Sequence, residues 1–252
     1  MVSIHVRKHK LQLNADKTEF MLFGSKQQLS KVSLPFITIS ESDIAPNTVA
    51  RNLGVVFDSN MTLVSHVSNI VKSASYHLCN IRKIRKYLNP HSTQQIIHAF
   101  VTSRLDMGNS LLYGLPQNQL KRLQNIQNAA ARIVTLSSKS THITPILKEL
   151  HWLPVRERII YKLMLLVFKS LNKMSPSYIS ELLQPYKPSR NLRSSTKFLL
   201  DVPRSFNSWG DRAFSIAAPQ LWNTLPHYIR TCNSVKKFKS LLKTYLMTQA
   251  FP

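Results

Sequence analysis

Residues 62–90, TLVSHVSNIVKSASYHLCNIRKIRKYLNP, decide what kind of fold this chain forms. Their apolar side chains recur every three or four residues, which predicts one face of a long amphipathic helix. These side chains are Val67, Val71, Ala74, Leu78, Ile81 and Leu88. The pair Asn89-Pro90 predicts the end of this helix, because proline disfavours helical backbone at the residue before it.

Further helices are expected along the rest of the chain. Their predicted ranges are 92–105, from Pro116 to Val134, 154–172, near 211–222 and 234–249. Phe100 lies in the helix predicted at 92–105 and is expected to face inward with its apolar neighbours. A helical bundle is the economical way to bury several such apolar faces.

The first sixty residues follow another pattern. FMLFG (20–24), PFITIS (35–40) and ARNLGVVFD (50–58) are short β-branched or aromatic runs between polar residues or prolines. They predict strands of a small antiparallel sheet. The expected fold class is therefore α+β and mainly α, with a small N-terminal β-element, a helical body and a C-terminal helical segment. The expected domain boundaries are 1–60, 61–184 and 185–252.

The charge of the chain points to a polyanionic partner. The chain has 252 residues, 34 Lys and Arg against 11 Asp and Glu, and a net charge of +23. Such a field attracts nucleic acid first and anionic membranes second. The excess is uneven, because residues 61–135 carry nine basic side chains and one acidic side chain. The alternative is that the charge only keeps the protein soluble.

Several classes of function have no signal in the sequence. Cys79 and Cys232 form no CxxC pair, which argues against a disulfide framework and a zinc site. No HExxH, GxSxG or phosphate-binding glycine loop occurs, and no two acidic residues are adjacent. No catalytic centre and no cofactor or metal site are predicted. The start of the chain lacks the apolar region of a signal peptide, so an intracellular location, nucleus or cytoplasm, is expected.

A basic cluster at the end of the first long helix is the best candidate for a binding site. NIRKIRKYLNP places four cations there, Arg82, Lys83, Arg85 and Lys86, while Ile84 is expected to face inward. Four cations on one helix end can contact several backbone phosphates. The third helix carries a weaker candidate cluster for phosphate contact, formed by Lys121, Arg122 and Arg132. The alternative is that these cations only interact with the helix dipole and water.

The C-terminal stretch SVKKFKSLLKTYL, residues 234–246, predicts a basic amphipathic helix. Such a helix can lie on a membrane surface or serve as a calmodulin-type target. The favoured interpretation is that its apolar face docks on the rest of the protein.

An ordered series of motifs resembles the C-terminal part of a non-LTR, LINE-type retrotransposon reverse transcriptase. The motifs are LQLNADKTEFMLFG (11–24), RNLGVVFD (51–58), SRLDMGNSLLYGLP (103–116), LQNIQNAAARIV (123–134), LHWLPVRERIIYKL (150–163), LRSS (192–195), LWNTLP (221–226) and FKSLLKTYL (238–246). Together they cover nearly the whole chain. The resemblance implies closing strands of a palm over 1–60, thumb-like helices over 61–184 that follow a template–primer duplex of RNA and DNA, and a C-terminal segment.

The resemblance also implies what is missing. Family enzymes bind Mg²⁺ through paired aspartates in a YADD hairpin just before the first motif, and this chain has no YADD. The expectation is therefore a truncated remnant that binds nucleic acid and does not polymerise. Lys17 matches the lysine that lies near the phosphates of the incoming nucleotide in the family. Two alternatives stay open: a domesticated helical module that binds a protein, and a fragment of a longer, active polymerase.

Overall fold

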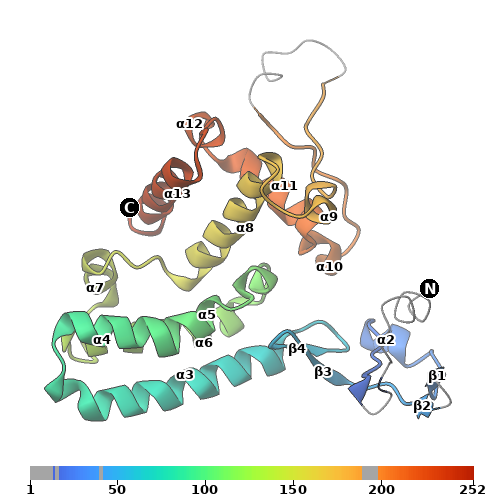
Figure 1. The fold of residues 1–252 in the computed structure, drawn as a ribbon, viewed down its shortest axis with the longest axis horizontal. Helices are drawn as coiled ribbons and strands as arrows, with labels where there is room; N and C mark the ends of the chain where they lie inside the picture. Colours follow the sequence, from blue (N-terminus) through green and yellow to red (C-terminus); the bar gives the residue numbers. More distant parts are fainter. Residues whose placement is uncertain (1–13, 15–16, 40–41, 189–197) are drawn as a thin grey trace. The chain divides into compact units, whose positions relative to one another are not determined.

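The computed structural model describes residue 14 and residues 17–39, 42–188 and 198–252 (Figure 1). The motif LRSS and most of 11–16 lie outside the described residues. The chain forms two compact units, Met1–Asn69 and Ile70–Pro252. The architecture is α+β and mainly α, as predicted, and the strands that the structure describes all lie in the first unit.

The strands of the first unit form two separate hairpins. β1 (Ile37–Ile39) pairs antiparallel with β2 (Ser42–Ile44), and β3 (Val49–Asn52) pairs antiparallel with β4 (Val55–Asp58). The prediction of antiparallel strands is confirmed, but the single sheet is wrong. Residues 50–58 form a hairpin because Leu53 and Gly54 both have positive φ, 47° and 85°. Two such residues make the turn that suits the twist of paired strands.

The predicted strand at 20–24 is wrong. Phe20 makes one isolated bridge to Pro46, and the short helix α2 (Lys26–Leu29) begins soon afterwards. Ser25 caps this helix by accepting a hydrogen bond from the Gln28 backbone N–H. The polar residues around this cap compete with a strand, which explains the difference.

The long helix predicted at 62–89 is α3 (Val64–Ile84), followed by a 3₁₀ turn, η2 (Arg85–Tyr87). Its start is fixed by Asp58, whose carboxylate accepts hydrogen bonds from the backbone N–H groups of Thr62 and Leu63 at 2.9 and 2.7 Å. Asn89 then caps α4 (Pro90–Ile97) through the N–H of Ser92 at 2.8 Å. A break at Asn89-Pro90 is therefore confirmed, but α3 itself ends earlier than predicted, at Ile84.

The second predicted helix contains a change of helical type. After α4 comes a π-helical turn, η3 (His98–Thr102), and then α5 (Ser103–Asp106). A π turn holds one more residue than an α turn and rotates the following side chains. Phe100, predicted to face inward, is 47% exposed as a result. A 3₁₀ turn, η4 (Asn109–Leu112), completes this segment.

Three helices build the middle of the second unit. They are α6 (Gln117–Thr135), α7 (Ile143–Glu149) and α8 (Val155–Leu171). The side chains of α6 hold the connection between the other two: Gln127 donates to the Leu153 carbonyl, and Gln124 accepts from the Val155 N–H, both at 2.8 Å.

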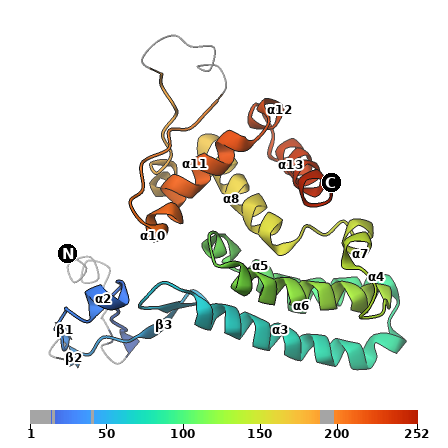
Figure 2. The ribbon, with the colours of Figure 1, turned by 180° about the vertical axis from the view of Figure 1, so that it is seen from behind.

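Five C-terminal helices follow, of which α9, α11 and α13 pack against α8, and Figures 1 and 2 show α11 and α13 beside it. They are α9 (Ser177–Ser180), α10 (Ser208–Asp211), α11 (Phe214–Thr224), α12 (His227–Arg230) and α13 (Val235–Ala250). Phe238 of α13 stacks on Phe168 of α8, with ring centroids 4.2 Å apart, and lies 6.0 Å from Trp222. The favoured interpretation of α13, that its apolar face docks on the body, is confirmed. Within the described ranges, no helix is both long and apolar enough to cross a bilayer.

Candidate nucleic-acid interface

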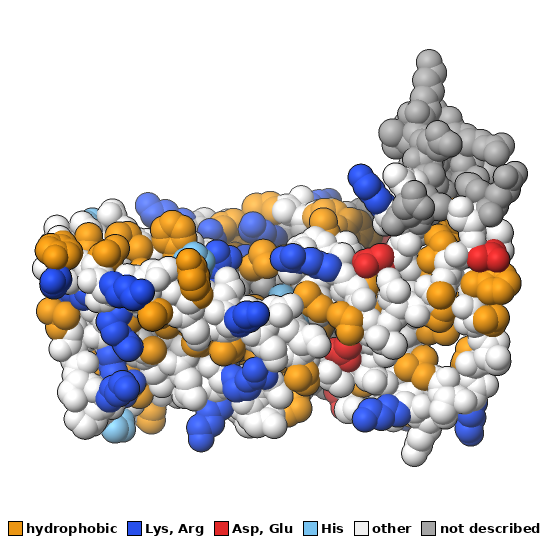
Figure 3. Space-filling model, turned by 90° about the horizontal axis from the view of Figure 1, so that it is seen from below, with side chains coloured by type: hydrophobic (Ala, Val, Ile, Leu, Met, Phe, Trp, Pro, Cys, Tyr) orange, Lys and Arg blue, Asp and Glu red, His pale blue; other side chains and the backbone are white. Residues whose placement is uncertain are grey.

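Lys and Arg side chains are prominent on the face that α3 forms. Figure 3 looks at this face, and over the C-terminal half of α3 its visible charged side chains are Lys and Arg. The sequence explains this, because no acidic residue occurs between Asp58 and Asp106. A face of this kind attracts the phosphates of nucleic acid.

Four of the seven predicted cations meet at one place, where the C-terminal ends of α3 and α6 come together. A hollow of about 640 Å³ lies there, and five of its nine lining side chains are cationic: Arg82, Arg85, Lys86, Arg132 and Lys139. We call it the basic hollow. Ala129, Ile133 and Leu136 supply apolar surface, and no acidic residue is among the lining residues that the structure describes.

Arg85 joins the two helix ends. It is 6% exposed, and its guanidinium donates to the carbonyls of Ile133 at 2.8 Å and Val134 at 2.9 Å in the last turn of α6. It also donates to the carbonyl of Leu88 at 2.6 Å. Because the last carbonyls of a helix lack partners within the helix, a buried arginine there satisfies them and opposes the helix dipole.

The sequence predicted Arg85 as one of four cations that contact phosphates, whereas in the structure its guanidinium contacts three backbone carbonyls. Ile84, predicted to face inward, is 45% exposed, while Arg85 is buried. The reason is that α3 ends at Ile84 and the 3₁₀ turn rotates the next residue toward α6.

The remaining cations form the rim of the hollow. Arg82, Lys86 and Lys139 are exposed, and Arg132 is half-buried and donates to the Thr141 carbonyl at 3.0 Å. The Lys86 ammonium lies 4.8 Å from the centroid of the Tyr87 ring. Cations around an apolar floor can hold phosphates while sugar carbons contact the floor, an arrangement that reads no base.

Other predicted residues lie elsewhere. Lys83 is exposed but does not line the hollow. Lys121 and Arg122 are in the first turns of α6, about 16 Å along the helix axis from Arg132 at 1.5 Å per residue. Lys17 is exposed in a short turn of the first unit.

Sequence reasoning missed Lys139. This residue follows the end of α6, where Leu136 adopts positive φ, 54°, and turns the chain back. A cation just beyond a predicted helix end was the available signal, because cations favour helix C-termini.

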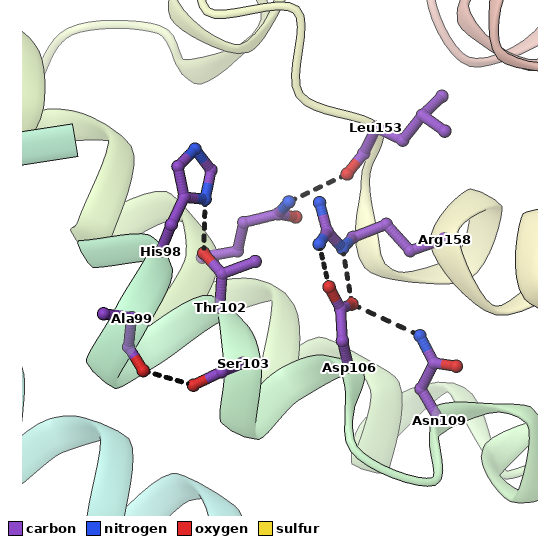
Figure 4. A network of polar contacts seen from close by, with 9 residues as sticks. His98, Ala99, Thr102, Ser103, Asp106, Asn109, Leu153 and Arg158 are labelled. Atoms are coloured by element: carbon purple, nitrogen blue, oxygen red, sulfur yellow. Dashed lines mark hydrogen bonds and ion pairs between the residues drawn. The ribbon is translucent and has the colours of Figure 1, made fainter. Parts of the chain in front are cut away.

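A second polar network lies in the same unit and connects the motifs of the chain (Figure 4). Arg158 of α8 forms a bidentate ion pair with Asp106, whose carboxylate also accepts from the Asn109 amide at 3.3 Å. Nearby, His98 Nδ1 lies 3.3 Å from the Thr102 hydroxyl. Burial lowers the pKa of His98, and the positive charge of Arg158 lowers it further.

Among the described residues, no three His, Cys, Asp or Glu side chains come together to hold a metal ion. Comparison with known proteins gives no further assignment: no family model, curated protein or solved structure matches this chain.

Proposed function

We propose that the protein binds the sugar–phosphate backbone of nucleic acid, with the basic hollow as the contact site. One observation carries this proposal. Five cationic side chains, from α3, η2, α6 and the loop after α6, line one hollow, and none of its described lining residues is acidic.

Three features of the hollow support a backbone ligand. Arg82, Lys86 and Lys139 are exposed and can approach phosphates directly. Arg85 keeps the two helix ends together, so the backbone segments that carry the rim cations are already side by side before a ligand arrives. A preorganised site loses less entropy on binding. The apolar floor favours a ligand with carbon surface, such as a sugar, over a free inorganic anion.

The resemblance to the C-terminal part of a non-LTR reverse transcriptase supports the same kind of ligand. In such an enzyme the thumb-like helices would follow a template–primer duplex, and α3 and α6 belong to the segment 61–184 that corresponds to them. We therefore take a short RNA–DNA hybrid as the ligand to test. The proposal concerns binding alone and assigns no reaction to the chain.

The test compares two variants that each lose three positive charges. One is Arg82→Ala, Lys86→Ala, Lys139→Ala, at the rim of the hollow. The control is Lys236→Ala, Lys237→Ala, Lys239→Ala, on the exposed side of α13. Affinity for a fluorescent hybrid is measured by anisotropy at about 0.1 M salt, where exposed charges within about 10 Å still interact.

The rim variant is expected to bind the hybrid about tenfold more weakly, which is about 1.4 kcal/mol of binding free energy. The control variant is expected to lose less affinity. Two hybrids of unrelated sequence should bind the wild type equally, because phosphate contacts carry no sequence information. Equal losses in both variants would contradict the hollow as the site. A wild type that binds no nucleic acid would favour a protein-binding module instead.

A further inference from the structure

A second cleft in the helical unit shares no residue with the basic hollow. It has a volume of about 420 Å³ and lies among η3, α5, the connection before α8, α8 itself and α13. This volume is within the range of about 300–1,000 Å³ that small-molecule sites occupy.

One wall of the cleft is aromatic. The rings of His98 and Trp152 have centroids 5.3 Å apart at an interplanar angle of 53°. Trp152 is only 5% exposed and supports the exposed His98 ring from behind. Tyr161 and Leu165 add to the same lining. An exposed imidazole face can stack on a nucleobase, as aromatic side chains do in single-strand recognition.

The polar groups of the cleft include amides and cations. The side chains of Gln94 and Asn109 lie at the lining and can donate or accept hydrogen bonds. Arg158 is already paired with Asp106, so that pair contributes no net charge. Lys162 and Lys243 are both exposed, and among the described residues neither forms an ion pair. The cleft therefore carries about two uncompensated positive charges.

We infer that this cleft binds one nucleotide, with the base against His98 and the phosphate at Lys162 and Lys243. An anion without a ring would leave the aromatic wall unused, and a neutral aromatic compound would leave the two lysines unused. Only a ligand with both parts uses the whole lining. The nucleotide is either free or the end of a single strand, and both present the same chemistry.

The test titrates the full chain with AMP, adenosine and ribose 5-phosphate by calorimetry. AMP is expected to bind more tightly than either of its parts. Lys162→Gln combined with Lys243→Gln is expected to weaken AMP binding about tenfold, which corresponds to 1.4 kcal/mol, while adenosine binding stays unchanged. The matched control, Lys236→Gln with Lys237→Gln, removes the same charge outside the cleft lining and should leave AMP binding unchanged.

His98→Ala separates stacking from charge. It should weaken the binding of AMP and of adenosine and leave the binding of ribose 5-phosphate unchanged. A 5′-phosphorylated single-stranded tetranucleotide distinguishes the two sources: tighter binding than AMP indicates a strand end, and equal binding indicates a free nucleotide. Equal losses in the two lysine pairs, or AMP binding no tighter than ribose 5-phosphate, would overturn the inference. The variants at the basic hollow leave this cleft intact, so failure of the proposed function would still leave AMP binding to be seen.

Discussion

Arg85 was predicted to contact phosphates, and in the structure it joins the ends of α3 and α6 through backbone carbonyls. It lies three positions from Arg82 in a run of cations, and the run alone gives the two arginines the same role. In the structure Arg82 is exposed, and Arg85 is buried against three backbone carbonyls. The difference depends on where α3 ends, and helix ends are weakly specified by local sequence.

Arg85→Ala is expected to lower the free energy of unfolding by about 2–4 kcal/mol, because it leaves buried carbonyls without donors. The control Arg82→Ala changes an exposed side chain and should alter stability by less than about 0.5 kcal/mol. Urea denaturation followed by circular dichroism measures both. Equal stability of the two variants would show that Arg85 does not hold the helix ends together.

His66 makes the stability of the first unit depend on pH. Its ring is 2% exposed, and its Nδ1 accepts a hydrogen bond from the Val56 N–H at 3.4 Å. Burial lowers the pKa of His66 from 6.5, and the charge of Arg51 lowers it further. Between the lowered pKa and 6.5, the unfolded chain binds more protons than the folded chain. The stability that the neutral ring contributes is therefore present above about pH 6.5 and is lost on acidification.

Thermal unfolding at pH 7.5 and pH 5 tests this contribution. The wild type is expected to lose stability on acidification, and His66→Gln, which stays neutral, should lose less. The matched control His91→Gln, at an exposed position, should behave like the wild type. If the wild type and His66→Gln lost the same stability on acidification, His66 would be ruled out as a source of the pH dependence.

At the scale of elements, periodicity predicted helices well and their interruptions poorly. The apolar faces of α3, α6, α8 and α13 lie mostly inside as expected, with Ile84 at the end of α3 as an exception. Phe100 was misplaced because a π turn, which has no simple sequence signal, shifts the register after His98. The helix α7 was not predicted, since Pro145 looks like a break. Proline is tolerated there because it lies in the first turn, where no hydrogen bond within the helix is lost.

The turn between β3 and β4 offers a test at this scale. Leu53 is 94% exposed and has φ of 47°, a conformation that costs an ordinary L-residue about 1–2 kcal/mol. Leu53→Asn should stabilise the hairpin by about 0.5–1 kcal/mol, because asparagine accepts this conformation. Gly54→Ala, at φ of 85°, should destabilise it. Chemical denaturation measures both, and a destabilised Leu53→Asn would contradict the assigned turn.

At the scale of the whole molecule, the motifs behind the family resemblance have structural roles in the helical unit. Asp106 and Asn109 come from the motif at 103–116, and they meet Arg158 from the motif at 150–163. Asn223 of LWNTLP bonds both the N–H and the carbonyl of Leu200 at 2.9 and 2.8 Å. These three motifs, which the sequence assigned to two predicted domains, lie in one packed unit. Motif order could not predict the hollow, which depends on the way two distant helix ends meet.

Polymerase activity is not expected from this chain. Two-metal phosphoryl transfer needs carboxylates that converge on both ions, and the sequence contains no YADD or other adjacent acidic pair. Primer extension on an RNA template with Mg²⁺ or Mn²⁺ is the assay, and no template-dependent product is expected. Extension that disappears when the acidic residues of the chain are replaced would show that this expectation is wrong.

The central claim is that the basic hollow contacts phosphates, and the salt dependence of binding tests it most directly. Affinity for the RNA–DNA hybrid is measured between about 50 and 200 mM salt, where each phosphate contact contributes about 0.9 to the slope of log K against log salt. The account predicts that the rim variant, Arg82→Ala, Lys86→Ala, Lys139→Ala, makes this negative slope less steep by about 2.7 when all three contacts are lost. The α13 control variant should keep the slope of the wild type. A rim variant with an unchanged slope would contradict the claim.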